Sequence, residues 1–260
     1  GYALSVDGAS ITERFNEPVY VPREDFETKK IEGANSGCED PRITKIEKNL
    51  YMCYTAFDGI GPPRVAVTSI GEKDFLSRHW NWSKPELITP KGVDDKDTCI
   101  FPEKVGGKYL VLHRIGTDIC ADFLKSLDFK KETVNKCIRI FGPRPGMWDS
   151  DKVGITAPPI RTKRGWVLLY HAISKDHHTY RVGEVLLDLK DPTMDGREKA
   201  LEIIAELVAQ EPILMPSLDP MAPPELMPSI QVDEFEDDHL LMATVVKEWT
   251  QTLTGRFHRR

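Results

Sequence analysis

The stretch Arg164-Gly165-Trp166-Val167-Leu168-Leu169-Tyr170-His171 joins a polar turn, an aromatic residue, an apolar run of strand length and a polar end. Residues 48–54 and 106–113 repeat that order of residue types, and 237–242 form a weaker copy. The aromatic residues of the three clear copies lie 58 and 57 residues apart (Tyr51, Tyr109 and Trp166). Recurrence of a turn, an aromatic residue and a strand at one interval indicates a repeated sheet unit.

A second series of short apolar runs shares this interval. We expect strands at 1–5, 64–68, 118–121 and 181–185, each followed by a polar turn. Short strands between Gly and Pro turns at a period of roughly 60 residues are typical of a β-propeller. The sequence therefore predicts an all-β fold of about four or five blades, with chance recurrence of strand patterns as the alternative.

The segment 195–210 interrupts the strand pattern. Asp195 is a candidate N-cap, and apolar residues follow it at helical spacing, which predicts one added helix near 196–209 (Leu201, Ile204, Leu207 and Val208). Residues 211–228 are rich in proline, which predicts an extended crossing. We expect one propeller domain over 1–260, with a helical insertion at 195–210 and an atypical last blade at 211–260.

Size and charge narrow the class of protein. The chain has 260 residues, 40% hydrophobic and 29% charged, which suits a globular domain with an adequate core. Its net charge of -6 argues against nucleic acid or an anionic membrane as a main partner, because both require a basic surface. No run approaches the roughly 20 apolar residues of a membrane span, and residue 1 does not begin a signal peptide. We expect a cytoplasmic protein, and the sequence is compatible with a homo-oligomer.

The cysteines are odd in number and show no paired spacing. Most of the five lie in apolar strand-like runs (Cys38, Cys53, Cys99, Cys120 and Cys137). This pattern predicts buried free thiols in a reducing compartment. Histidines and acidic residues show neither zinc nor calcium-loop spacing, so no metal site is expected.

The stretch 37–44, Gly-Cys-Glu-Asp-Pro-Arg-Ile-Thr, places two carboxylates and a guanidinium just before the apolar run 50–54. Pro41 should push Asp40 toward an extended backbone, so that Asp40 and Arg42 project at a defined angle from a stiffened turn. Glu39 lies beside them. A pocket that performs chemistry is one interpretation, and a surface ion pair at a turn is the other.

Cationic side chains occur at strand ends or entering loops of successive repeats (Lys96, Arg114, Lys152 and His171). In a propeller the inner strands surround a central funnel, so such residues meet at one pocket even when they are far apart in sequence. Individually each could be a solvated or structural group. Together they fit an anion pocket, and phosphate suits it because Arg offers a bidentate fork and Lys a compact charge.

Several strings together resemble glycoside hydrolase family 130. They occur in the family's order from about residue 1 to 216: Cys-Glu-Asp-Pro-Arg-Ile-Thr at 38–44, Tyr-Thr-Ala-Phe-Asp-Gly at 54–59, Phe-Pro-Glu-Lys at 101–104, Leu-His-Arg at 112–114, Ala-Pro-Pro-Ile at 157–160, Gly-Trp-Val-Leu-Leu-Tyr-His at 165–171 and Leu-Leu-Asp-Leu-Lys-Asp-Pro at 186–192. The resemblance implies a five-bladed propeller. The blades at the two ends of this sequence can be incomplete. Most members of the family are β-mannoside phosphorylases and some are β-mannosidases.

The resemblance also implies roles for individual residues. Asp40 corresponds to the proton donor. The phosphate-binding positions correspond to Lys96, Arg114, Lys152, His171 and Tyr180, with Lys96 standing where the family has Arg. We expect the sugar to contact the remaining candidates (Glu39, Arg42, Asp58, Asp97, Trp148 and Asp149). Inorganic phosphate is then a co-substrate, and no cofactor is needed.

These residues are consistent with an inverting, glycosyltransferase-type phosphorylase. One acid assists the leaving sugar while phosphate attacks the anomeric carbon, so no second carboxylate is required as a base. The predicted partners are a β-mannoside oligosaccharide and phosphate, and the predicted product is mannose 1-phosphate. Two alternatives stay open: a β-mannosidase that uses water, and a sugar-binding propeller without turnover. The linkage and the acceptor sugar are also open.

Overall fold

The computed structural model describes residues 1–7, 10–33, 36–176 and 179–193. These residues form an all-β fold whose only α-helix is the five-residue α1 (Glu72–Leu76), beside one 3-10 turn, η1 (Asp25–Glu27). Within these ranges no helix is long and apolar enough to cross a membrane. The predicted helix 196–209, the fourth repeat 237–242 and the last blade 211–260 lie outside the described residues.

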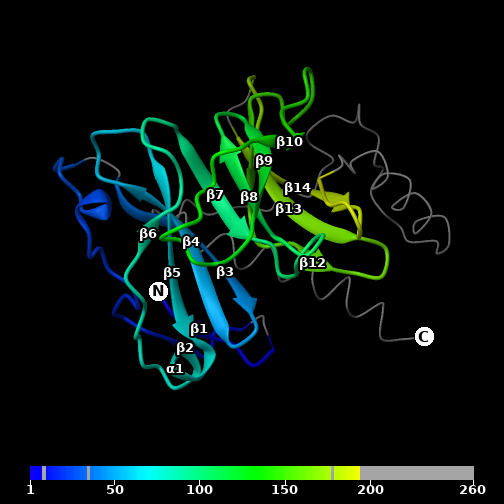
Figure 1. The fold of residues 1–260 in the computed structure, drawn as a ribbon. Helices are drawn as coiled ribbons and strands as arrows, with labels where there is room; N and C mark the ends of the chain where they lie inside the picture. The colour runs from blue at the N-terminus through cyan, green and yellow to red at the C-terminus, as the bar shows by residue number, and fades with distance from the viewer. Residues whose placement is uncertain (8–9, 34–35, 177–178, 194–260) are drawn as a thin grey trace.

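Three four-stranded sheets follow one another along the chain (Figure 1). The first contains β3 (Gly37–Ile46), β4 (Asn49–Phe57), β5 (Arg64–Gly71) and β6 (Glu86–Leu87) in that order. The second has β7 (Asp95–Ile100), β8 (Tyr109–Ile115), β9 (Asp118–Leu124) and β10 (Ile138–Phe141). In the third, β13 (Trp166–Ile173) pairs with β11 (Lys152–Ile155), β12 (Ile160–Arg161) and β14 (Tyr180–Leu187). A separate hairpin joins β1 (Ala3–Leu4) to β2 (Glu13–Arg14).

All these pairings are antiparallel, as in propeller blades. The three copies of the sequence repeat form β4, β8 and β13, so the repeated sheet unit is confirmed for three units. The runs 64–68, 118–121 and 181–185 also lie in strands, as predicted. Closure into a ring and the number of five blades stay predictions.

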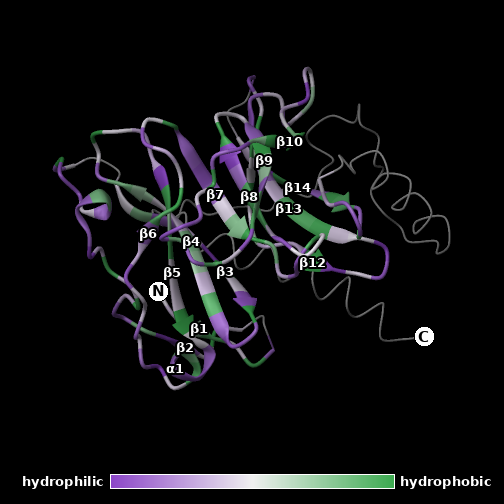
Figure 2. Ribbon diagram, in the orientation of Figure 1, coloured by the Kyte–Doolittle hydropathy of each residue, from purple (hydrophilic) through white to green (hydrophobic). Residues whose placement is uncertain are grey.

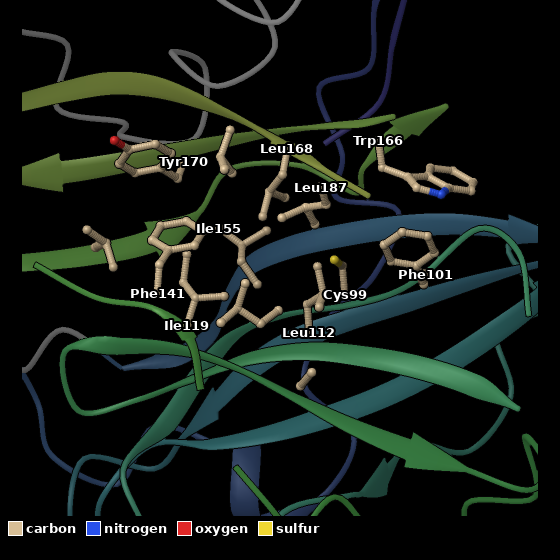
Figure 3. Close-up of a cluster of buried hydrophobic side chains, with 14 of the residues drawn as sticks. Cys99, Phe101, Leu112, Ile119, Phe141, Ile155, Trp166, Leu168, Tyr170 and Leu187 are labelled. Carbon is tan, nitrogen blue, oxygen red and sulfur yellow. The ribbon is translucent and has the colours of Figure 1, made fainter. Parts of the chain in front are cut away.

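Hydrophobic residues lie along strands of the sheets (Figure 2), and their buried side chains hold neighbouring sheets together. The second and third sheets share the largest buried cluster, in which Phe101 meets Trp166 with ring centroids 4.4 Å apart (Figure 3). Another cluster joins Cys53 and Val67 of the first sheet to Val111 of the second. Side chains alternate between the two faces of a strand, and this alternation lets each sheet pack on both neighbours. The second sheet is therefore fixed between the first and the third.

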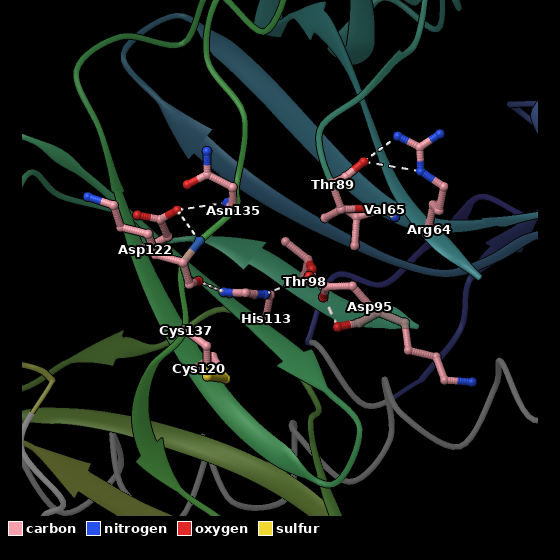
Figure 4. A network of polar contacts seen from close by, with 12 residues as sticks. Arg64, Val65, Thr89, Asp95, Thr98, His113, Cys120, Asp122, Asn135 and Cys137 are labelled. Atoms are coloured by element: carbon pink, nitrogen blue, oxygen red, sulfur yellow. Dashed lines mark hydrogen bonds and ion pairs between the residues drawn. A yellow bond between two sulfur atoms is a disulfide. The ribbon is translucent and has the colours of Figure 1, made fainter. Parts of the chain in front are cut away.

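Cys120 and Cys137 form a disulfide (Figure 4), so the prediction of five free thiols is wrong for this pair. Cys120 lies on β9, and Cys137 directly precedes β10, its antiparallel neighbour. The strand pairing brings the two Cα atoms to 4.9 Å across 17 residues of sequence, which spacing alone did not reveal. Cys38, Cys53 and Cys99 are free, and burial raises the pKa of Cys99 to about 12.

A polar network fixes the chain just before Cys137 (Figure 4). The Asp122 carboxylate accepts hydrogen bonds from the backbone N–H groups of Asn135 and Lys136. The buried His113 ring contacts the Lys136 carbonyl through Nε2 at 3.0 Å and Asp95 Oδ2 through Nδ1 at 2.8 Å. The disulfide therefore closes a loop whose end is already held against β8 and β9.

Replacing both cysteines of the disulfide with serine should lower the free energy of unfolding by about 3 kcal/mol, the value expected for a closed loop of roughly 15 residues. Urea denaturation followed by circular dichroism measures this change. The single variant Cys38→Ser is the matched control and should shift the midpoint far less. An unchanged midpoint in the double variant would show that the cross-link contributes nothing.

Candidate active site

The stretch Glu39-Asp40-Pro41-Arg42 lies inside strand β3, where we expected a turn before a strand. Glu39 pairs with Thr55 and Arg42 with Cys53, so β3 carries one extra residue at a β-bulge. Asp40 has a φ of 51°, which corrects the prediction of an extended backbone. The bulge outweighs the preference that Pro41 imposes, and Pro41 itself faces solvent, where a missing N–H costs nothing.

Strand β7 carries a matching bulge. Lys96 pairs with Arg114 and Cys99 with Leu112, and Asp97 between them has a φ of 52°. Asp97 follows Asp40 by 57 residues, the interval of the sheet repeat. Few residues other than Gly adopt positive φ, and such residues concentrate at functional sites. Two successive sheets therefore present an aspartate in the same unusual backbone conformation.

Asp97 is the centre of a buried charge cluster built from all three sheets. Its Oδ1 lies 3.2 Å from Arg42 Nη2 on β3. Its Oδ2 lies 3.1 Å from Arg114 Nη1 on β8 and 3.7 Å from His171 Nε2 on β13. Asp97 is only 2% exposed, so solvent hardly screens these contacts.

The Arg42 guanidinium ties this cluster to Asp40. Arg42 donates hydrogen bonds from Nε to the Ile155 carbonyl at 2.9 Å and from Nη1 to the Asp40 carbonyl at 2.8 Å. Burial alone would raise the pKa of Asp97, but the charges of Arg42 and Arg114 hold it below the ordinary value. Asp97 is therefore a permanent anion near neutral pH, and Arg42 fixes the backbone that carries Asp40.

His171 is neutral at physiological pH. Burial lowers its pKa to about 4, and the charges of Arg42 and Arg114 act in the same direction against those of Asp97 and Asp40. The effect of Asp40 on this pKa reflects its proximity to the ring. His171 can thus offer one N–H and one acceptor nitrogen to a ligand, without a full charge.

The other predicted phosphate ligands lie beside these groups. Lys96 is directly opposite Arg114 across the β7–β8 pair. Lys152 and Tyr180 both align with Ile173 of β13, and Lys152 Nζ lies 5.5 Å from the centroid of the Tyr180 ring. The rings of Tyr180 and His171 have centroids 5.7 Å apart. The five predicted phosphate ligands are thus grouped on the second and third sheets.

The predicted sugar ligands are not all gathered there. Glu39 is half-buried next to Asp40, whereas Arg42 and Asp97 are buried and engaged with each other. Asp58 follows β4 and forms an ion pair with Lys30 at 2.8 Å. The hydrogen bond that Lys30 Nζ donates to Asp58 Oδ2 lowers the pKa of Asp58 to about 2.

Trp148 and Asp149 lie on the other side of the third sheet from His171. Trp148 stacks on Tyr170, with centroids 5.7 Å apart, and packs against the core shared with the second sheet. The buried Asp149 accepts hydrogen bonds from the Tyr170 hydroxyl at 3.1 Å and from Arg144 Nε. Adjacent strand residues face opposite ways, so Tyr170 points away from His171. A sugar contact by Trp148 or Asp149 stays a prediction.

Comparison with known proteins identifies the family. A family model described as beta-1,4-mannooligosaccharide phosphorylase, of glycoside hydrolase family 130, matches residues 1–219. The chain belongs to glycoside hydrolase family 130. This confirms the resemblance noted in the sequence and agrees with the all-β fold.

Family 130 relatives match much of the chain. A 1,2-beta-oligomannan phosphorylase from Thermoanaerobacter sp. (strain X514) is 38% identical over 84% of this chain and 64% of its own length. The structure of beta-1,2-mannobiose phosphorylase from Listeria innocua in complex with beta-1,2-mannobiose is 30% identical, with a TM-score of 0.57 over 74% of this chain and 50% of that one. This chain thus spans less than two thirds of either protein.

A third comparison concerns hydrolysis within family 130. One solved structure is described with the words "The GH130 family of mannoside phosphorylases contains glycoside hydrolases that target beta-1,2 mannosidic linkages in Candida mannan". It is 25% identical, with a TM-score of 0.57 over 75% of this chain and 59% of that one. Family membership therefore establishes a carbohydrate-active enzyme family and leaves the choice between phosphate and water to the site.

Proposed function

We propose that this family 130 chain acts as an inverting phosphorylase of β-mannosides, with Asp40 as the general acid and inorganic phosphate as the nucleophile. The observation that carries this proposal is the grouping of Arg114 and His171 around Asp97, with Lys96 opposite Arg114, Lys152 over the Tyr180 ring beside His171, and Asp40 close enough to His171 to affect its pKa. A hydrolase has no use for such a set of cations. β-1,2-Linked mannosides are the first substrates to test, because the named phosphorylases above act on that linkage.

Two buried nitrogen atoms support an anion at this site. Within the described part of the chain, the buried atoms without a hydrogen-bond partner include Arg114 Nε and His171 Nδ1, together with the carboxylate oxygen Asp97 Oδ2 that lies between these two residues. Buried polar groups are nearly always paired, so each of these atoms suggests a missing ligand or water. Phosphate oxygens suit both the guanidinium and the imidazole N–H.

The charge of the site also suits phosphate. The predicted site contains four cationic side chains and three carboxylates (Arg42, Lys96, Arg114 and Lys152; Glu39, Asp40 and Asp97), of which Arg42 and Arg114 pair with Asp97. Asp40 must hold a proton when it acts as the acid, which leaves two positive charges in excess. A hydrogen phosphate dianion would balance them.

The reaction balances without another reagent. A phosphate oxygen forms a bond to the anomeric carbon as the bond from that carbon to the glycosidic oxygen breaks. The proton of Asp40 passes to the departing oxygen, directly or through a sugar hydroxyl, and the products are mannose 1-phosphate and the shortened sugar. In inverting hydrolysis a second carboxylate would have to activate water. Asp97 is poorly suited to that task because two guanidinium groups hold it.

The direct test is to incubate the protein with β-1,2-mannobiose, with and without inorganic phosphate. Mannose 1-phosphate formed only with phosphate supports the proposal. Free mannose at a rate independent of phosphate would favour the hydrolase, and binding without turnover would favour a sugar-binding domain.

Lys152→Ala should raise the KM for phosphate by about tenfold to a hundredfold, because a hydrogen bond to a charged group contributes about 1.5 to 3 kcal/mol. The KM for mannobiose should stay within about twofold, since the lysine is assigned to phosphate alone. Lys163→Ala, at an exposed turn, is the matched control. An unchanged requirement for phosphate in Lys152→Ala would remove this lysine from the phosphate site.

A further inference from the structure

Asp97 is more deeply buried than a residue that contacts a bound sugar would be. It is 2% exposed, and its two oxygens are divided between Arg42 on one side and Arg114 and His171 on the other. Although Asp97 Oδ2 makes no hydrogen bond, a mannose hydroxyl would have to enter among these buried charged groups to reach it, and separating such groups is strongly unfavourable. The carboxylate therefore acts on protein groups.

Gly154 makes this arrangement possible. It lies on β11, directly opposite His171 of β13. A Cβ atom at this glycine would lie 2.4 Å from Asp97 Oδ2 and 2.5 Å from His171 Nε2, far inside normal contact distance. Gly154 is not among the glycines with positive φ, so its backbone suits any residue and only the space requires glycine.

The three residues recur at the sequence interval of the sheet repeat. Asp40, Asp97 and Gly154 follow one another at intervals of 57 residues, on β3, β7 and β11. This interval thus carries the proposed general acid on β3, a buried anion on β7 and a residue without a side chain on β11. Because Gly154 has no side chain, Asp97 of the second sheet can approach His171 of the third sheet.

Building on the proposed function, we infer that Asp97 is a positioning residue, seated over Gly154, that holds Arg114 and His171 in the orientation that binds phosphate. Asp97 touches neither sugar nor phosphate in this account. Its carboxylate attracts Arg114 Nη1 at 3.1 Å and, at 3.7 Å, favours an orientation of the His171 ring with Nε2 toward Asp97. The unpartnered Arg114 Nε and His171 Nδ1 are then held ready for an anion.

Asp97→Asn keeps the shape of the side chain and removes its charge. We expect the KM for phosphate to rise at least tenfold while the KM for mannobiose changes less than twofold. Asp128→Asn, at an exposed ion pair with Lys131, is the matched control and should change neither value. A rise in the KM for mannobiose alone would make Asp97 a sugar ligand and overturn the inference.

A histidine titration by NMR separates positioning from a general loss of structure. The charge of Asp97 raises the pKa of His171, so Asp97→Asn should lower that pKa further below its value of about 4. The signal is assigned by its loss in His171→Gln. An unchanged His171 titration together with unchanged affinity for inorganic phosphate would overturn the inference.

Gly154→Ala tests the same inference with every charge retained. The added methyl group should push Asp97 and His171 apart, raising the KM for phosphate at least tenfold and shifting the His171 titration. Gly71→Ala is the control, because a Cβ there would meet nothing within 4 Å. If Asp97→Asn does not fold, the KM for phosphate and the His171 titration of Gly154→Ala test the inference instead. A normal KM for phosphate in Gly154→Ala would contradict it. Wild-type protein that makes no mannose 1-phosphate would instead refute the proposed function.

Discussion

Asp40→Asn should lower the turnover number for mannobiose by about a hundredfold to ten-thousandfold, the contribution expected of a general acid. The amide cannot give a proton to the departing oxygen. Asn accepts positive φ as readily as Asp, so the bulge of β3 should persist and the melting temperature should change little. Initial rates of phosphate-dependent release of mannose 1-phosphate and thermal unfolding by circular dichroism measure the two effects.

A substrate with a better leaving group makes this test specific. The 4-nitrophenolate of 4-nitrophenyl β-mannoside departs with little need for a proton, so the loss of activity in Asp40→Asn should shrink markedly with this substrate. Asp128→Asn is the surface control. An equal loss with both substrates would indicate a disturbed pocket, and an unchanged rate with mannobiose would remove Asp40 as the acid.

Arg42→Met should lower the free energy of unfolding by about 3 to 5 kcal/mol, the range for removal of one partner of a buried ion pair. Arg42 is 3% exposed, and its loss leaves Asp97 with one guanidinium fewer. It also removes the donors that serve the carbonyls of Asp40 and Ile155. Urea denaturation gives the free energy directly.

Arg139→Met provides the matched control. Arg139 pairs with Asp118 at 3.2 Å, but its side chain is 56% exposed, so its loss should cost less than about 1 kcal/mol. Adding Asp97→Asn to Arg42→Met should cost less than the sum of the two single changes, because the interaction between Arg42 and Asp97 can be lost only once. Equal destabilisation by Arg42→Met and Arg139→Met would show that the Asp97 cluster does not hold the three sheets together.

The repeat was predictable because it depends on local patterns. An aromatic residue and an apolar run are determined by strand burial, so Tyr51, Tyr109 and Trp166 revealed the positions of β4, β8 and β13. The resemblance to family 130 added the role of Asp40 and the phosphate set.

Features that depend on the register between paired strands were not found. The bulge at Asp40 follows from the register of β3 against β4, which overrides the local preference set by Pro41. The disulfide depends on the register of β9 and β10. One signal for the Asp97 cluster was present in the sequence: Asp40, Asp97 and Gly154 share the repeat interval. An alignment of the three sequence repeats at this 57-residue interval, residue by residue, places these three residues in one column.

In the proposed reaction, cations from neighbouring sheets hold phosphate opposite the single acid Asp40, and the anomeric form of the first product distinguishes this arrangement from its alternatives. NMR of the reaction with β-1,2-mannobiose and inorganic phosphate distinguishes the anomers as they form. Attack from the face opposite the leaving sugar inverts the anomeric centre, so we expect α-mannose 1-phosphate in a one-to-one ratio with the released mannose. β-Mannose 1-phosphate, or free mannose without any sugar phosphate, would contradict it.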